Sequence, residues 1–217
     1  SELYELYKGL AGMCVELAAG KPDKTEYQKL LFEIYRDVLN NDIMANPATG
    51  TVDLHRFRNI FNTALDISET NWAEQFLRKY LHTLPKEHVT NLEHFFHGKI
   101  EYVKGNFDKT LEYFSKLDQA QFIFMKDLKY EYLKCYYALN HTESAISLVD
   151  SFRHFVSNND SVPEFQRTEV LDFLKKYMSL VNLRIRYSKN KYEELERLLK
   201  DSKDSWFYKS LKEIKAS

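Results

Sequence analysis

The sequence predicts an all-α fold, and three observations support that prediction. Glycine and proline number only 6 and 4 in 217 residues, fewer than an all-β or loop-rich chain needs for its turns. Residues that favour helices, such as leucine, lysine and glutamate, occur throughout the chain. Apolar residues recur with a period near 3.6 along almost its whole length. Because 44% of the residues are apolar, the chain has enough apolar surface for a substantial core.

Residues 1–40 are expected to form an N-terminal pair of helices. The first helix is predicted over about residues 3–19, where a Gly-Lys-Pro sequence follows and ends it. The second is predicted over about residues 23–40, and Asp23 with Glu26 has the spacing of a capping box at its start. The side of the first helix that we expect to be buried comprises Leu3, Leu6, Leu10, Met13 and Leu17.

The remaining helices bring the predicted total to about eleven. An Asn-Pro and a Thr-Gly pair mark residues 41–52 as the clearest loop of the chain. Two further capping boxes, Thr90 with Glu93 and Ser161 with Glu164, indicate helix starts. The predicted helices after the loop cover residues 53–67, 69–83, 90–105, 106–117, 125–138, 141–156, 161–189 and 191–200, and a last short one begins near Ser205.

The stretch from Gly98 to Phe114 is the most informative segment of the chain. A small residue, Gly98, is followed by Tyr102, then by a turn residue, Gly105, and then by Phe107. In this order the small residue lets two helices approach, the glycine accepts a positive φ in the turn, and the aromatic rings fill the wedge between helix pairs. The order is typical of a repeated helix-turn-helix unit, which must stack on neighbouring units to bury its apolar face.

The same order returns further along the chain. Moving 35 residues on places Tyr137, Asn140 and Ala145 at the positions of the tyrosine, the turn residue and a small contact residue. A further 50 residues on, Tyr187 and Asn190 take the first two of these positions. Asparagine tolerates a positive φ better than most residues, so Asn140 and Asn190 are predicted to be turn residues.

These residues resemble the tetratricopeptide repeat family. The resemblance is good over residues 92–117, fair over 127–153, and weak over 53–83 and 177–200. It implies one α-α superhelix of paired helices over residues 53–217, right-handed, with a concave face that commonly binds peptides or other proteins. The 50-residue step, and leucines where the family has small residues, depart from its pattern and indicate an irregular pitch. The Trp-Phe-Tyr sequence near the C-terminus is expected to belong to a helix that caps the last repeat.

The first helix of each of the three better repeats carries a cation three residues before a tyrosine. Residues i and i+3 share one face of a helix, so stacked repeats would align these pairs into a ladder of cations and phenols. Such a ladder would hold an extended peptide that carries carboxylates. The alternative is that the tyrosines pack and the cations are ordinary solvated residues, and the asparagines of the family's carboxylate clamp have no matching set here. The candidate groove residues are Lys99, Tyr102, Lys134, Tyr137, Arg184 and Tyr187.

Two histidines close together in the sequence are the candidate metal ligands. His94 and His97 lie one turn apart, and His97 has the i, i+4 spacing to Glu101 that suits two metal ligands. The zincin pattern, two histidines four residues apart with a glutamate between them, does not occur in the sequence. The resemblance to tetratricopeptide repeats also implies that His97 lies at the interface of its helix pair. We therefore expect a structural role for these histidines and no metal. Cys14 and Cys135 are expected to be buried free thiols, which favours a reducing, cytoplasmic compartment.

Composition excludes several classes of function. The sequence has no glycine-rich phosphate loop and no Gly-x-Ser-x-Gly elbow, so we expect neither an enzyme nor a cofactor. No apolar run approaches 18 residues, so no membrane span is expected. The formal net charge is −1, and the basic stretch 184–191 is the main feature that would favour nucleic acid, so nucleic-acid binding is not the expected function.

The sequence therefore predicts a non-enzymatic scaffold that binds a protein or peptide, of acidic character if the ladder is used. Three alternatives stay open at this point. The chain starts with Ser1 rather than methionine, so it can be a regulatory or sensor domain of a longer protein that clamps a neighbouring domain. Helical repeats with a period near 35 residues also bind RNA, which gives the second alternative. The third is a metal-dependent enzyme built around His94 and His97.

Overall fold

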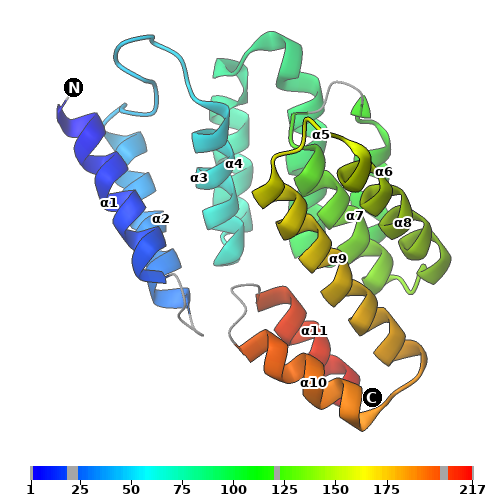
Figure 1. Ribbon diagram of the computed structural model, residues 1–217. Coiled ribbons are helices and arrows are strands. Elements are labelled where there is room, and N and C mark those ends of the chain that lie inside the picture. Colours follow the sequence, from blue (N-terminus) through cyan, green and yellow to red (C-terminus); the bar gives the residue numbers. More distant parts are fainter. Residues whose placement is uncertain (1, 19–23, 120–122, 201–204, 217) are drawn as a thin grey trace. The chain divides into compact units, whose positions relative to one another are not determined.

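The computed structural model is all-helical over the residues it describes, which are 2–18, 24–119, 123–200 and 205–216. Those ranges contain eleven α-helices and no strand (Figure 1). The prediction of an all-α chain with about eleven helices is confirmed.

The chain divides into two compact units, residues 1–128 and residues 129–217, and the boundary falls inside α7. The helices of the first unit are α1 (Glu2–Ala18), α2 (Thr25–Asn40), α3 (Leu54–Asp66), α4 (Thr70–Tyr80), α5 (Lys86–Val103) and α6 (Phe107–Ser115), with a 3-10 turn at Leu81–Thr83. α7 (Met125–Ala138) is followed in the second unit by α8 (Thr142–Asn158), α9 (Glu164–Ile185), α10 (Lys189–Lys200) and α11 (Ser205–Ala216).

The predicted capping boxes do not define the helix starts. α5 begins directly after Pro85, so Thr90 lies inside the helix, and the prediction of a start at Thr90 is wrong. The physical reason is that proline suits the first positions of a helix, where its missing N–H costs nothing. α9 likewise begins directly after Pro163 and has no side-chain hydrogen bond at its cap, although Ser161 is close by. Asp23 lies outside the described residues.

Within the described residues, four helix ends share one backbone geometry. After α2, Asp42 (φ 53°) has a positive φ and Ile43 donates its N–H to the carbonyl of Val38, before the loop that leads to α3. The other three helix ends lie in short turns between helices. Gly105 (φ 80°) ends α5 and Asn140 (φ 59°) ends α7, as predicted, and Ser68 (φ 64°) does the same after α3. In each turn the residue after the positive-φ residue donates its N–H to a carbonyl five residues back, which is the hydrogen bond of a Schellman cap. The donor and acceptor pairs are Glu69 with Ala64, Asn106 with Glu101, and His141 with Tyr136. Asn190 lies inside α10, so the prediction of a turn there is wrong.

The spacing of these turns gives a different alignment for the α3–α4 hairpin. The step from Ser68 to Gly105 is 37 residues, whereas the sequence comparison used 35. With the corrected step, Ala73, Thr110 and Ala145 each lie five residues after a turn residue, and all three are buried. The comparison at 35 residues therefore placed residues 53–83 two positions out of step with these turns.

The first helices of successive hairpins pack side by side within each unit. In the first unit, the ring of Phe96 on α5 lies 5.3 Å from Phe57 and 4.5 Å from Phe61 on α3. In the second unit, the rings of Tyr130 on α7 and Phe173 on α9 stack at 3.9 Å. The aromatic residues thus fill the space between these helices within each unit.

The close approach predicted at Gly98 is confirmed. A Cβ atom built on Gly98 of α5 would lie 2.4 Å from the ring of Phe114 on α6. Because real Cβ atoms do not approach other atoms so closely, only glycine fits this position unless the helices move apart.

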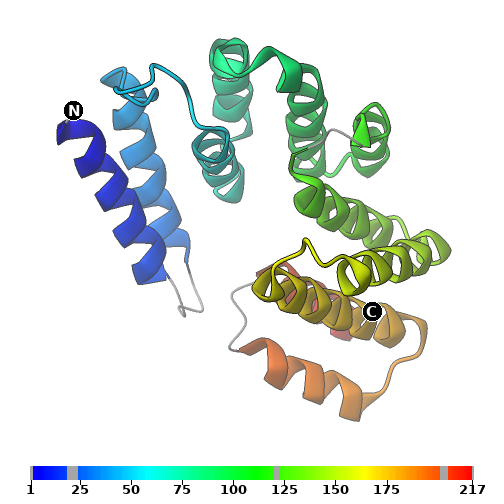
Figure 2. The ribbon, with the colours of Figure 1, turned by 45° about the horizontal axis from the view of Figure 1, so that its top comes forward.

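The predicted buried side of α1 is wrong. Figures 1 and 2 both show α1 antiparallel to α2 and beside it, but the side of α1 that is buried carries Tyr4 and Cys14. The five predicted core residues, Leu3, Leu6, Leu10, Met13 and Leu17, are all exposed. The reason is that a helix can carry two apolar stripes, and the neighbouring helix covers only one of them.

The C-terminal helix α11 packs against α9 and α10. Phe207 is buried, and the ring of Trp206 lies 5.5 Å from Tyr137 and 6.2 Å from Tyr177. The aromatic residues near the C-terminus therefore cover α9 inside the second unit.

Candidate functional site

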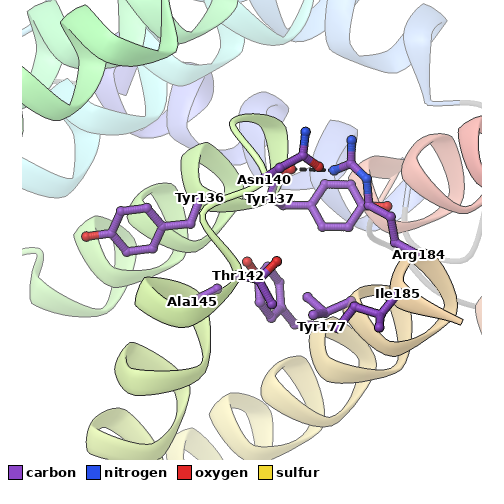
Figure 3. Close-up of a pocket in the computed structure, with 9 residues that line it drawn as sticks. Tyr136, Tyr137, Asn140, Thr142, Ala145, Tyr177, Arg184 and Ile185 are labelled. Atoms are coloured by element: carbon purple, nitrogen blue, oxygen red, sulfur yellow. Dashed lines mark hydrogen bonds between the residues drawn. The ribbon is translucent and has the colours of Figure 1, made fainter.

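A small cavity in the second unit is the best candidate site, because two of the predicted groove residues line it. It lies where the end of α7, the start of α8 and the end of α9 meet, and its volume is about 150 Å³ (Figure 3). The lining residues are Tyr136, Tyr137, Asn140, Thr142, Ala145, Tyr177, Val181, Arg184 and Ile185.

Arg184 is held in place by the end of α7. Its guanidinium lies over the ring of Tyr137, 4.7 Å from the centroid, and its Nη1 donates a hydrogen bond to the backbone carbonyl of Tyr137. Figure 3 shows the side chain reaching from α9 toward this carbonyl and Asn140. A guanidinium has five N–H donors in a planar fork. An arginine fixed in this way needs to lose little conformational entropy when it binds a carboxylate.

Tyr177 forms the floor of the cavity and joins α9 to α7. It is fully buried, and its hydroxyl donates a 2.7 Å hydrogen bond to the carbonyl of Leu133. Burial raises the pKa of Tyr177 well above the ordinary range, and burial also raises the pKa of Tyr137, although Arg184 acts in the opposite direction. Both phenols therefore stay protonated at neutral pH, and the single O–H of Tyr177 is donated to Leu133 rather than to an occupant of the cavity.

The rest of the lining includes both polar and apolar residues. Asn140 occupies the left-handed turn position and Thr142 is the first residue of α8, so the shared turn geometry places both at the cavity. Ala145, Val181 and Ile185 supply the apolar part. The cavity thus combines one cation with neutral donors and apolar residues, a composition that suits a carboxylate on a short apolar stem.

The structure brings together two of the six predicted groove residues, Tyr137 and Arg184. Lys134 forms an ion pair with Glu131 at 3.5 Å, and Tyr187 packs its ring against Tyr192 at 6.0 Å. Neither residue lines the cavity. The sequence argument paired the cation and tyrosine within one repeat, whereas here the tyrosine of one hairpin meets the arginine of the next.

The third predicted pair lies in the first unit. Lys99 has its ammonium 5.7 Å from the ring centroid of Phe95, and the rings of Tyr102 and Phe107 meet edge-on at 5.3 Å. Both side chains therefore pack on aromatic neighbours of their own hairpin.

Sequence reasoning missed Tyr177, which lines the cavity and is fully buried. Its position seven residues before Arg184 was an available signal, because residues i and i+7 lie on one face of a helix. Tyr136 and Thr142 were missed because their role depends on how the turn after α7 folds.

A second cavity, in the first unit, has a volume of about 410 Å³ and contains His97 in its lining. The ring of His97 stacks on Tyr113 of α6 at 5.6 Å, and His94 lies 6.4 Å from the same ring. His97 is therefore at the interface of its helix pair, as predicted. Among the described residues, no group of three or more histidine, cysteine, aspartate or glutamate side chains is placed to hold a metal ion. The residues that line this cavity are Glu74, Leu77, Arg78, Leu81, His82, Val89, Glu93 and His97.

Both cysteines are buried and free, as predicted. Burial raises the pKa of the Cys135 thiol far above its ordinary value, with a smaller contribution from Glu131 in the same direction. The thiol is therefore neutral at physiological pH, and a neutral, buried thiol is a poor nucleophile.

No helix in the described part of the chain combines the length and the apolar character needed to cross a membrane. Comparison of the chain with protein-family models, with curated proteins and with solved structures found no match. The resemblance to tetratricopeptide repeats thus rests on the residues and turns described above.

Proposed function

We propose that this chain is a non-enzymatic, tetratricopeptide-like scaffold that binds a peptide segment of another protein. The observation that carries the proposal is the cavity in which Tyr137 of one hairpin and Arg184 of the next hairpin meet. The three equivalent turns and the side-by-side first helices support a repeat architecture, which binds partners along the surface formed by those first helices.

The size of the cavity indicates which part of a peptide it would take. Pockets for small-molecule ligands usually have volumes of roughly 300–1,000 Å³. At about 150 Å³, this cavity is too small for such a ligand, but it has room for one side chain. Arg184 supplies the positive charge, so the favoured occupant is an acidic side chain or a terminal carboxylate of the peptide.

The test begins with a display library of short random peptides panned on the intact chain. The enriched peptides are synthesised again with each Asp or Glu replaced by Asn or Gln, and with the C-terminal carboxylate amidated. We expect binding to depend on one of these carboxylates, and Arg184→Gln to weaken it by roughly 10- to 100-fold, because a charge-assisted hydrogen bond contributes about 1.5–3 kcal/mol.

Arg186→Gln is the matched control, because Arg186 is two residues further on, is exposed, and does not line the cavity. It should leave the affinity unchanged. If no peptide is enriched, or if the two variants lower the affinity equally, the proposal is wrong. Circular dichroism of both variants checks that the helices are retained.

A further inference from the structure

Helix α1 carries an apolar stripe on its exposed surface. Large apolar side chains that lie 38–58% exposed recur along it at steps of three, four, three and four residues. This is the spacing of the a and d positions of a heptad, which in coiled coils contact another helix. Contiguous exposed apolar patches of this kind mark interaction sites. The stripe is formed by Leu3, Leu6, Leu10, Met13 and Leu17.

The stripe is separate from the face by which α1 packs in the first unit. Tyr4 and Cys14 are buried, α1 packs against α2, and Arg56 of α3 has its guanidinium 4.5 Å from the ring centroid of Tyr4. At about 100° per residue, the stripe is centred roughly a quarter of the way around the helix from those two buried residues. Among the described residues, α1 therefore has one packed face, and the adjacent face that carries the stripe is exposed to solvent.

The outer flank of the stripe is acidic. Glu2, Glu5 and Glu16 are exposed, and at helical spacing they lie on the side of the stripe that faces away from the packed face. Lys8 approaches Glu5 at 3.7 Å, but both side chains are well exposed, and such a pair contributes little. The stripe is thus bordered by three carboxylates on one side and by the packed face on the other.

This charge pattern disfavours a second copy of the chain as the occupant. In a two-fold antiparallel pair of α1 helices, the acidic flanks of the two copies would face each other and repel. In a parallel pair, the acidic flank of one copy would face the side of α1 that already packs on α2. In addition, the stripe spans about two heptads, whereas a self-standing coiled coil needs roughly three to four.

The same flank disfavours a membrane surface, because the anionic lipids of a bilayer attract basic segments and repel carboxylates. A helix with basic flanking residues has the complementary charge. We propose that the stripe of α1 docks an amphipathic helix of a partner protein, whose apolar seam is flanked by lysine or arginine. This is helix-against-helix recognition, in which the seam supplies the buried area and the flanking charges select the partner. The inference is independent of the cavity that carries the proposed function.

The probes are two synthetic helical peptides of about 20 residues with the same leucine seam. One has lysine on both flanks of the seam and the other has glutamate. Fluorescence anisotropy with the intact chain should show the lysine peptide binding at least tenfold more tightly. The Leu6→Gln/Leu10→Gln/Met13→Gln variant should lose this binding, and a variant with Glu2, Glu5 and Glu16 each changed to Gln should lose the preference for lysine.

Two single variants are controls because they alter exposed apolar residues outside the stripe. Val15→Gln lies on α1 itself and Leu198→Gln on α10, and both should bind the lysine peptide as the parent does. If the triple variant loses helicity by circular dichroism, Leu6→Gln alone is used, and it should still weaken binding severalfold.

Three results would overturn the proposal that the stripe docks a basic amphipathic helix. Equal binding of the two peptides, or equal loss in Val15→Gln, would mean nonspecific hydrophobic adsorption. A parent that sediments as a dimer, with a monomeric triple variant, would assign the stripe to a second copy. Co-sedimentation of the parent, but not of the triple variant, with phosphatidylcholine–phosphatidylserine vesicles would assign it to a lipid surface.

Discussion

Helices α1 and α5 both carry apolar residues at helical spacing in the sequence. These residues are buried in α5 but exposed in α1. In α5, Leu92, Phe95, Phe96 and Ile100 are buried between α3, α4 and α6. In α1, every residue of the predicted apolar side is exposed, and burial falls on a different side of the helix.

The difference between them comes from the number of neighbours. α5 packs against α4 and α6, and its Phe96 ring contacts α3, so its apolar residues are covered on several sides. α1 packs mainly on α2, so it has one covered face and an uncovered one. Periodicity therefore identifies an amphipathic helix, but the face that is covered depends on which neighbours are present.

The largest expected difference between the two helices is in the stability lost when a leucine is replaced by alanine. Leu92→Ala should lower the free energy of unfolding by about 2–5 kcal/mol, because Leu92 is 1% exposed and its removal leaves a cavity. Leu6→Ala on α1 should change it by less than about 0.5 kcal/mol, because the side chain is mostly in solvent. Urea unfolding followed by circular dichroism measures both values. Similar losses for the two variants would show that the stripe of α1 is buried in solution.

Replacing a glycine by alanine should destabilise the protein in α5 but stabilise it in α1. Gly98→Ala is expected to destabilise by about 1–3 kcal/mol, because the new Cβ meets the Phe114 ring. Gly12→Ala on α1 should stabilise by about 0.5–1 kcal/mol, because no atom lies within 4 Å of the new Cβ and alanine favours the helix. The thermal midpoints of the two variants should therefore move in opposite directions, and a shift in the same direction would contradict the packing of one of the helices.

The turn that follows α5 offers a smaller test of the repeat itself. Gly105→Ala should cost about 1 kcal/mol, because a Cβ is unfavourable at φ 80°. Ser68→Gly should have the opposite effect, with a gain below about 1 kcal/mol, if the α3–α4 turn has the same geometry. Asn190→Gly serves as a control. Asn190 lies within α10, where glycine is unfavourable, so this substitution should destabilise the protein. Chemical unfolding of the three variants measures these changes. A loss of stability in Ser68→Gly would contradict a positive φ at Ser68.

The smallest expected effect concerns the covered face of α1. Burial raises the pKa of Tyr35 on α2, Arg56 lowers it, and Cys14 of α1 adds a smaller increase. Because the folded-state pKa lies above the unfolded value, this contribution to stability is fully present below the unfolded pKa and is lost as the pH rises through the folded pKa. The parent should therefore lose more stability than Tyr35→Phe between about pH 8 and about pH 11. Equal losses in urea unfolding at the two pH values would mean that α1 and α2 leave Tyr35 hydrated.

The sequence predicted the local features that depend on a few neighbouring residues. Gly105 and Asn140 were identified as turn residues because few side chains tolerate a positive φ, and Gly98 was identified because only a small residue permits a close approach of two helices. The turn at Ser68 was missed, since serine gives no such signal and the repeat step there is 37 residues rather than 35. The sequence analysis named Tyr137 and Arg184, which line the candidate site. It paired Tyr137 with Lys134 and Arg184 with Tyr187, whereas in the structure Tyr137 and Arg184 contact each other.

The sequence by itself thus determined the all-α class, two of the turns and the close approach at Gly98, because these follow from backbone preference and side-chain size. The tertiary structure decided which residues meet. The contact between Tyr137 and Arg184 joins residues 47 positions apart and depends on how α9 packs beside α7. The exposed stripe of α1 likewise depends on what lies against the helix, because a helix presents all its faces and only its neighbours determine which of them is buried.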